Sequence, residues 1–166
     1  MRRFRQLCQQ HRQRIYTYAR YYLGNSEDAE DATQEVLLRL WDQGERVGDD
    51  DVPRWLTRVA RNICLDQLRR RRTRRETEPP PDLSGGAPGP AEELERAEFR
   101  RRLQRALEGL EETQRSLVVL RDIQGLSYDE IAQALDMPLN RVKVYLHRAR
   151  QKLRRILREG EVNGPE

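Results

Sequence analysis

Residues 126–155, LSYDEIAQALDMPLNRVKVYLHRARQKLRR, follow the pattern of two helices joined by a tight turn. Ser127 can cap the first helix, and Glu130, three residues later, can reach back to the amide of the cap residue. Asp136 and Pro138 break the pattern, because aspartate tolerates unusual turn dihedrals and proline fits a first helical turn. A second helix is therefore predicted to begin at residue 138 or 139. This layout predicts a helix-turn-helix, a motif that lays its second helix in the DNA major groove.

The second helix of this motif has one apolar and one basic face. The apolar residues recur at steps of four and three and are predicted to pack inward: Val142, Leu146, Ala149, Leu153 and Ile156. From residue 137 to 158 the chain has eight basic residues and no acidic one, a surface that attracts phosphates. A solvated basic face is the alternative for any arginine-rich helix. The capped helix before it favours DNA, and the candidate base-reading residues are Lys143, Val144, His147, Arg148 and Arg141.

Composition agrees with a nucleic-acid partner. The 166 residues carry a net charge of +4, and all basic residues except Lys143 and Lys152 are arginines, which favour bidentate phosphate and guanine contacts. No apolar stretch is long enough to span a membrane and no signal-peptide pattern is present, so we expect a cytoplasmic protein. Cys8 and Cys64 lie too far apart to indicate a zinc site, and no metal or cofactor is expected. No nucleophile–base constellation or phosphate-binding glycine loop appears, so we expect no catalytic residue and no enzyme.

A change in composition divides the chain. The segment around TEPPPDLSGGAPGP is rich in proline and glycine and poor in apolar residues, which predicts a flexible linker over residues 76–92. Apolar residues recur at helical spacing on both sides, as in Phe99, Leu103, Ala106 and Leu110, and nothing in the chain is typical of a strand. The sequence thus predicts an all-α protein with two small helical domains, residues 1–75 and 93–160, behaving as separate tethered bodies.

The N-terminal half contains an acidic helix. Asn25 or Ser26 can cap it, and its predicted buried stripe is Ala29, Ala32, Val36, Leu37, Leu40 and Trp41. Some of its acidic residues suit a helix N-terminus. Asp31, Gln34 and Glu35 share an exposed face, and an acidic patch on a basic protein suggests docking to a basic protein surface.

A further helix, beginning at Pro53, has the character of a second nucleic-acid surface. Trp55, Val59, Ile63 and Leu68 are its predicted core, and we expect both tryptophans to be buried rather than to stack on bases. Its outer face carries the candidates Arg58, Arg61, Asn62, Arg69 and Arg70. An arginine run alone is usually a nonspecific electrostatic patch. Asn62 can hydrogen-bond a base edge, and we therefore propose contact with exposed bases in addition to phosphate binding.

Together these segments resemble the extracytoplasmic-function (ECF) group of bacterial sigma factors over nearly the whole chain. The resemblance rests on DAEDATQEVLLRLW, WLTRVARNICLDQLRRRR and the helix-turn-helix, in this order. It implies a promoter-specificity subunit of RNA polymerase. Asp31, Gln34 and Glu35 would dock on the clamp helices of the largest polymerase subunit. Asn62, with its arginine neighbours and the loop at about residues 43–52, would capture flipped bases of the −10 element. The candidates on the last helix would read the −35 duplex.

The resemblance leaves two points open. Asn140 and Arg141 stand where the family often has Gly-Thr, so the −35 sequence preference is not defined, and Glu111, where proline is frequent, is expected only to lengthen a helix. An inhibitory anti-sigma protein is a further candidate partner that no residue identifies. The alternative is an ordinary helix-turn-helix regulator that binds operator DNA without polymerase, which would leave the acidic helix and the Asn62 helix without a role.

Overall fold

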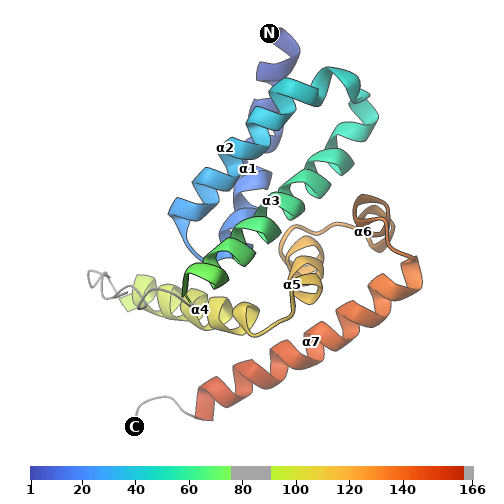
Figure 1. Cartoon of the computed structure of the whole chain (residues 1–166). Helices are drawn as coiled ribbons and strands as arrows, with labels where there is room; N and C mark the ends of the chain where they lie inside the picture. Colours follow the sequence, from blue (N-terminus) through green and yellow to red (C-terminus); the bar gives the residue numbers. More distant parts are fainter. Residues whose placement is uncertain (76–90, 163–166) are drawn as a thin grey trace.

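The computed structural model describes residues 1–75 and 91–162, and within these ranges the protein is built of helices and connecting turns, with no strand (Figure 1). The α-helices are α1 (Arg2–Leu23), α2 (Ser26–Gln43), α3 (Val52–Arg75), α4 (Ala91–Glu108), α5 (Glu112–Val118), α6 (Tyr128–Leu135) and α7 (Leu139–Val162). Two 3₁₀ turns, η1 (Gly44–Arg46) and η2 (Asp49–Asp51), join α2 to α3, and a π-helical turn, η3 (Val119–Ile123), extends α5. Residues 76–90 of the predicted linker lie outside the described residues, and its last two residues begin α4.

Helices α1, α2 and α3 pack around one another in the N-terminal half. Gly24 ends α1 with φ +90°, a left-handed conformation that glycine adopts without strain. Asn25 then caps α2, and its side chain accepts a hydrogen bond from the Asp28 amide at 2.8 Å. The predicted N-terminus of α2 is confirmed. The buried residues of these helices include Tyr18, Tyr22, Ala29, Val36, Leu56 and Ile63.

The helix-turn-helix comprises α6 and α7, as predicted. The Ser127 hydroxyl accepts from the Glu130 amide at 3.1 Å, and the Glu130 carboxylate accepts from the Ser127 amide at 3.2 Å. Asp136 ends α6 with φ 52°, a left-handed conformation that aspartate tolerates. Val142, Leu146 and Ala149 are buried, whereas Leu153 and Ile156 are half-buried. α7 packs against α4, α5 and α6.

Two predictions about single positions were wrong, and one apolar residue at helical spacing is exposed. Glu111 does not lengthen a helix: α4 ends at Glu108, and Glu111 is the N-cap of α5. Trp41 is 52% exposed, since its ring packs only edge-on against Phe4, with the ring centroids 4.9 Å apart. Phe99 is 60% exposed on the first part of α4, where no described element covers it.

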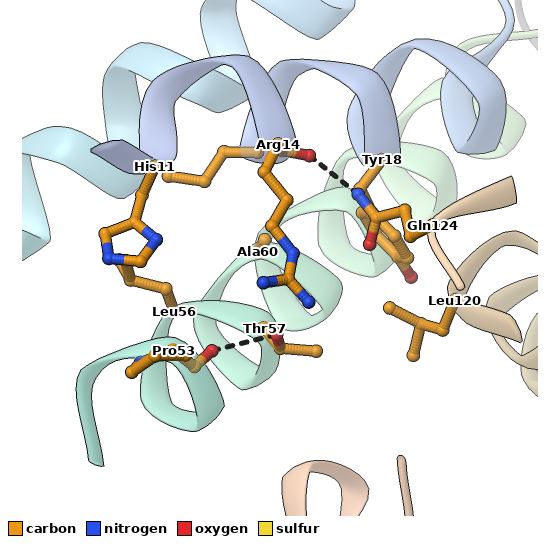
Figure 2. A pocket seen from close by; sticks show the side chains of 10 residues that line it. His11, Arg14, Tyr18, Pro53, Leu56, Thr57, Ala60, Leu120 and Gln124 are labelled. Carbon is orange, nitrogen blue, oxygen red and sulfur yellow. Dashed lines mark hydrogen bonds between the residues drawn. The ribbon is translucent and has the colours of Figure 1, made fainter. Parts of the chain in front are cut away.

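The two halves of the chain, predicted as two tethered helical domains, are in contact in this structure. The Gln124 side chain donates to the Arg14 carbonyl of α1 at 2.7 Å, beside a small cavity lined by Leu56, Thr57 and Leu120 (Figure 2). α3 packs against α6, and α1 packs against α4 and η3. Buried residues of both halves form one continuous core, and the buried hydroxyls of Tyr18 and Ser116 are hydrogen-bonded across the contact at 3.0 Å. The domains therefore share an interface while each keeps its own helical framework. Within the described ranges, no helix is long and apolar enough to cross a membrane.

Candidate nucleic-acid and protein interfaces

The reading face predicted on α7 is exposed. Arg141, Lys143, Val144, His147 and Arg148 all lie at the surface, and Val144 is 45% exposed. Within the described ranges, none of these five side chains makes a hydrogen bond or an ion pair. The five span about 10 Å along the helix axis, which is comparable to the width of the DNA major groove at about 12 Å.

Packing of the opposite face of α7 fixes the orientation of this reading face. The buried side chains of Val142 and Leu146 anchor the helix in the core. Farther along, Arg150 forms a bidentate ion pair with Asp122 of η3, with its Nε 3.0 Å from Oδ2. The hydrogen bond with this carboxylate raises the pKa of Arg150. This arginine therefore holds α7 to the π-helical turn and leaves the more N-terminal residues to meet a ligand.

On α3 the predicted −10 residues divide into two groups. Asn62 and Arg70 are exposed, and within the described ranges neither side chain has a hydrogen-bond partner. Arg61 is half-buried, and its buried Nε has no partner among the described residues. Arg58 and Arg69 instead contact the C-terminal half of the chain. Arg58, Asn62 and Arg69 lie on one face of the helix, since spacings of four and eleven residues return to nearly the same angle.

The contacts of Arg58 and Arg69 are specific. Arg58 Nε donates to the Ala134 carbonyl at 2.9 Å, and its Nη2 donates to the Gln133 carbonyl at 3.2 Å. These carbonyls belong to the last turn of α6, where the helix leaves acceptors unsatisfied. Arg69 donates to Glu112 Oε2 of α5 at 3.2 Å, which raises the pKa of this arginine. The −10 surface predicted on α3 is thus partly covered by the helix-turn-helix domain.

The exposed face of α2 that carries the acidic residues also includes apolar side chains. Asp31 and Gln34 are exposed, and Glu35 is half-buried with a weak ion pair to Arg39 at 3.4 Å. Leu38 is 61% exposed and, like Trp41, continues this face at helical spacing, so two large apolar side chains lie beside the acidic group. Sequence reasoning missed both. Their spacing of seven and ten residues from Asp31 is the signal that could have placed them there.

The two cysteines are free thiols in different environments. Cys64 is buried in α3, and desolvation raises the pKa of its thiol well above the usual range. Cys8 is half-buried on α1, and burial raises its pKa as well.

Comparisons with known proteins agree on one family. The family model described as "Sigma-70 region 2" matches residues 7–74, and "Sigma-70, region 4" matches residues 100–153. Both matches fall within the two domains predicted from the sequence.

Individual relatives give the same result. ECF RNA polymerase sigma factor SigE of Mycolicibacterium smegmatis is 37% identical over 155 residues, covering 92% of this chain and 60% of its own length. SigM of Mycobacterium tuberculosis is 36% identical over 155 residues, covering 93% and 76%. The sigma factor RpoE of Bartonella quintana, solved in complex with the anti-sigma factor NepR, has the same fold, with a TM-score of 0.73 at 23% identity, covering 95% of this chain and 98% of its own. The chain thus spans 60% of the length of the first of these relatives, which is less than two thirds.

Proposed function

This chain belongs to the ECF RNA polymerase sigma factors of the sigma-70 family, and from this premise we propose that it binds core RNA polymerase and directs promoter-specific initiation. It acts by binding, without a reaction of its own. The two domains, at about residues 1–75 and 93–160, read the −10 and −35 elements. The observation that carries the proposal is the exposed basic reading face of α7 in a chain that also presents a separate acidic docking face on α2.

The −35 role belongs to the N-terminal half of α7. Arg148 and Lys143 offer cationic donors to guanine edges, and Val144 offers methyl groups that can contact a thymine methyl. Arg141 and His147 complete the face. Arginines farther along the helix, such as Arg154, are exposed and suit phosphate contacts that position the helix without reading sequence.

The −10 role belongs to α3 and the loop before it. Asn62 is exposed and can make paired hydrogen bonds to an unstacked base, while Arg58, Arg61, Arg69 and Arg70 supply cations for the opened strand. Base flipping costs a few kcal/mol, and contacts of this kind offset it.

The polymerase-docking role belongs to the exposed face of α2. Asp31, Gln34 and Glu35 supply its polar part, and Leu38 and Trp41 add apolar area that a protein partner can bury. The setting of these roles is the cytoplasm, where promoter DNA and polymerase are found. A protein inhibitor of the anti-sigma kind is a further partner, since relatives of the same fold bind one.

Reconstitution with core RNA polymerase tests the proposal. The purified chain is expected to co-elute with core polymerase and to support initiation at selected sites on genomic DNA. The double variant Asp31→Arg/Glu35→Arg is expected to lose co-elution because two attractions become repulsions, while its binding to duplex DNA stays unchanged. A chain that binds duplex DNA but neither co-elutes nor supports initiation would be an ordinary regulator instead.

A further inference from the structure

Arg3, near the start of α1, contacts three parts of the loop between α2 and α3. Its Nη1 donates to the Gly44 carbonyl at 2.7 Å, and its Nη2 donates to the Val47 carbonyl at 2.7 Å. Its Nε donates to the Asp49 carboxylate at 2.9 Å. One guanidinium therefore joins the first 3₁₀ turn, the extended residue after it and the start of the second turn.

From this geometry we propose that Arg3 is a positioning residue for −10 recognition, which holds the loop of residues 44–51 in the shape that receives a flipped base. The proposal rests on the proposed function, in which this loop and Asn62 share the captured base. Arg3 itself need not touch DNA.

The local packing explains why the loop depends on such an anchor. Gly44 is buried against α2, and a Cβ there would lie only 2.9 Å from Leu40 Cδ1. The rest of the loop buries little side-chain surface, since Val47 is only half-buried and the aspartates of η2 are exposed. The loop's own backbone hydrogen bonds, such as Val47 N to the Gly44 carbonyl at 3.2 Å, close single turns only. Within the described ranges, Arg3 is the side chain that hydrogen-bonds to both turns, while Arg54 of α3 pairs with Asp51 of the second turn.

The planar fork of arginine suits this task. Its donors point in fixed directions and can serve three separated acceptors at once, whereas a lysine ammonium is a compact point charge. Arg3→Lys is therefore expected to hold part of the loop, and Arg3→Gln to hold almost none. Arg5→Gln is the matched control. Arg5 is exposed on the same helix, and its replacement by glutamine removes the same positive charge.

Two measurements on the full chain test the role of Arg3. Hydrogen exchange of the Val47 and Asp51 amides, which are hydrogen-bonded within the loop, is expected to accelerate about ten-fold in Arg3→Gln and to remain unchanged in Arg5→Gln. Initiation by the reconstituted polymerase from templates randomised over the −10 element then gives the base preference. Arg3→Gln is expected to lose about ten-fold or more of its discrimination at the captured base, because displacing a positioned group by about 1 Å can cost about 100-fold. Arg3→Lys is expected to recover part of both properties.

The outcomes separate this inference from the proposed function. A wild-type chain that gives no selective initiation overturns the proposed function, and the role of Arg3 with it. A selective wild type whose Arg3→Gln variant keeps the same base preference overturns the role of Arg3 alone, even if the loop exchanges faster.

Discussion

Replacing Arg115 with methionine tests how the two halves of the chain are joined. Arg115, on α5, is only 2% exposed. Its guanidinium donates to the Leu107 and Glu108 carbonyls, at 2.9 and 3.1 Å, where α4 ends. It also donates to the Tyr22 carbonyl, at 3.0 Å, where α1 ends. Since helix C-termini carry partial negative charge, this buried cation is stabilised by two helix ends rather than by a carboxylate.

The magnitude follows from these contacts. Methionine fills a similar space but donates nothing, and it leaves three carbonyls short of a partner at about 1 kcal/mol or more each. The contact of the guanidinium with the Tyr22 ring, 5.3 Å from its centroid, adds about 1 kcal/mol. Desolvation, which lowers the pKa of Arg115, no longer opposes folding once the charge is gone, and this offsets part of the loss. We expect a net loss of about 3 kcal/mol, or about 9 °C in Tm for a chain of this size.

Thermal unfolding followed by circular dichroism measures this change. Arg105→Met is the control, because Arg105 is exposed on α4 and its loss is expected to change stability by less than about 0.5 kcal/mol. Arg115→Lys keeps the charge but not the fork of donors, and its Tm is expected to lie between those of Arg115→Met and Arg105→Met. If Arg115→Met melted within about 2 °C of the wild type, the assignment of Arg115 as the anchor of two helix ends would be wrong.

Three further predictions concern other sites. Arg148→Ala is expected to cost about 1–3 kcal/mol of binding free energy at a selected −35 site and to relax the preference at one base pair, whereas Arg154→Ala is expected to weaken binding to all sequences alike. Footprinting at several salt concentrations checks both, and an unchanged base preference would remove Arg148 from the reading face. Iodoacetamide at neutral pH is expected to alkylate Cys8 well before Cys64, because burial keeps the Cys64 thiol protonated and inaccessible. Mass spectrometry of the digested protein gives the order of alkylation, and equal rates would contradict the buried environment of Cys64. Burial and Arg14 lower the pKa of His11 in the folded chain. Between the folded-state and unfolded-state pKa values the unfolded chain therefore binds more protons, so stability rises with pH across that window. His11→Gln is expected to flatten this part of the Tm–pH curve, and an unaltered slope would contradict the prediction.

The elements could be predicted from the sequence because their signals are local. Asn25 and Ser127 cap helices with hydrogen bonds to residues three positions away, and Asp136 adopts the turn conformation that its side chain tolerates. The order and type of the helices therefore follow from short windows of sequence. The exposure of Trp41 does not, because a residue at the edge of an apolar stripe is buried only if a neighbouring element reaches it.

Arg115 shows what a sequence pattern cannot contain. Its acceptors are backbone carbonyls seven, eight and 93 residues away, and a carbonyl has no residue type to recognise. Nothing in the sequence distinguishes this arginine from the many that lie at the surface. The contact between the domains was missed in part for the same reason, since several of its acceptors are main-chain oxygens.

The arginines of α3 were recognised by their chemistry, and their partners in the free chain follow from that same chemistry. A guanidinium that suits phosphate oxygens also suits the carbonyls at the end of α6 and the carboxylate of Glu112, because all are oxygen acceptors with negative charge or partial charge. Sequence can therefore predict that Arg58 and Arg69 bind oxygen acceptors without predicting which acceptors they bind. In the proposed function the difference matters, because DNA acceptors would compete with these protein acceptors for the same donors. A ligand that binds the arginines of α3 would have to offset the hydrogen bonds that Arg58 and Arg69 make in this structure.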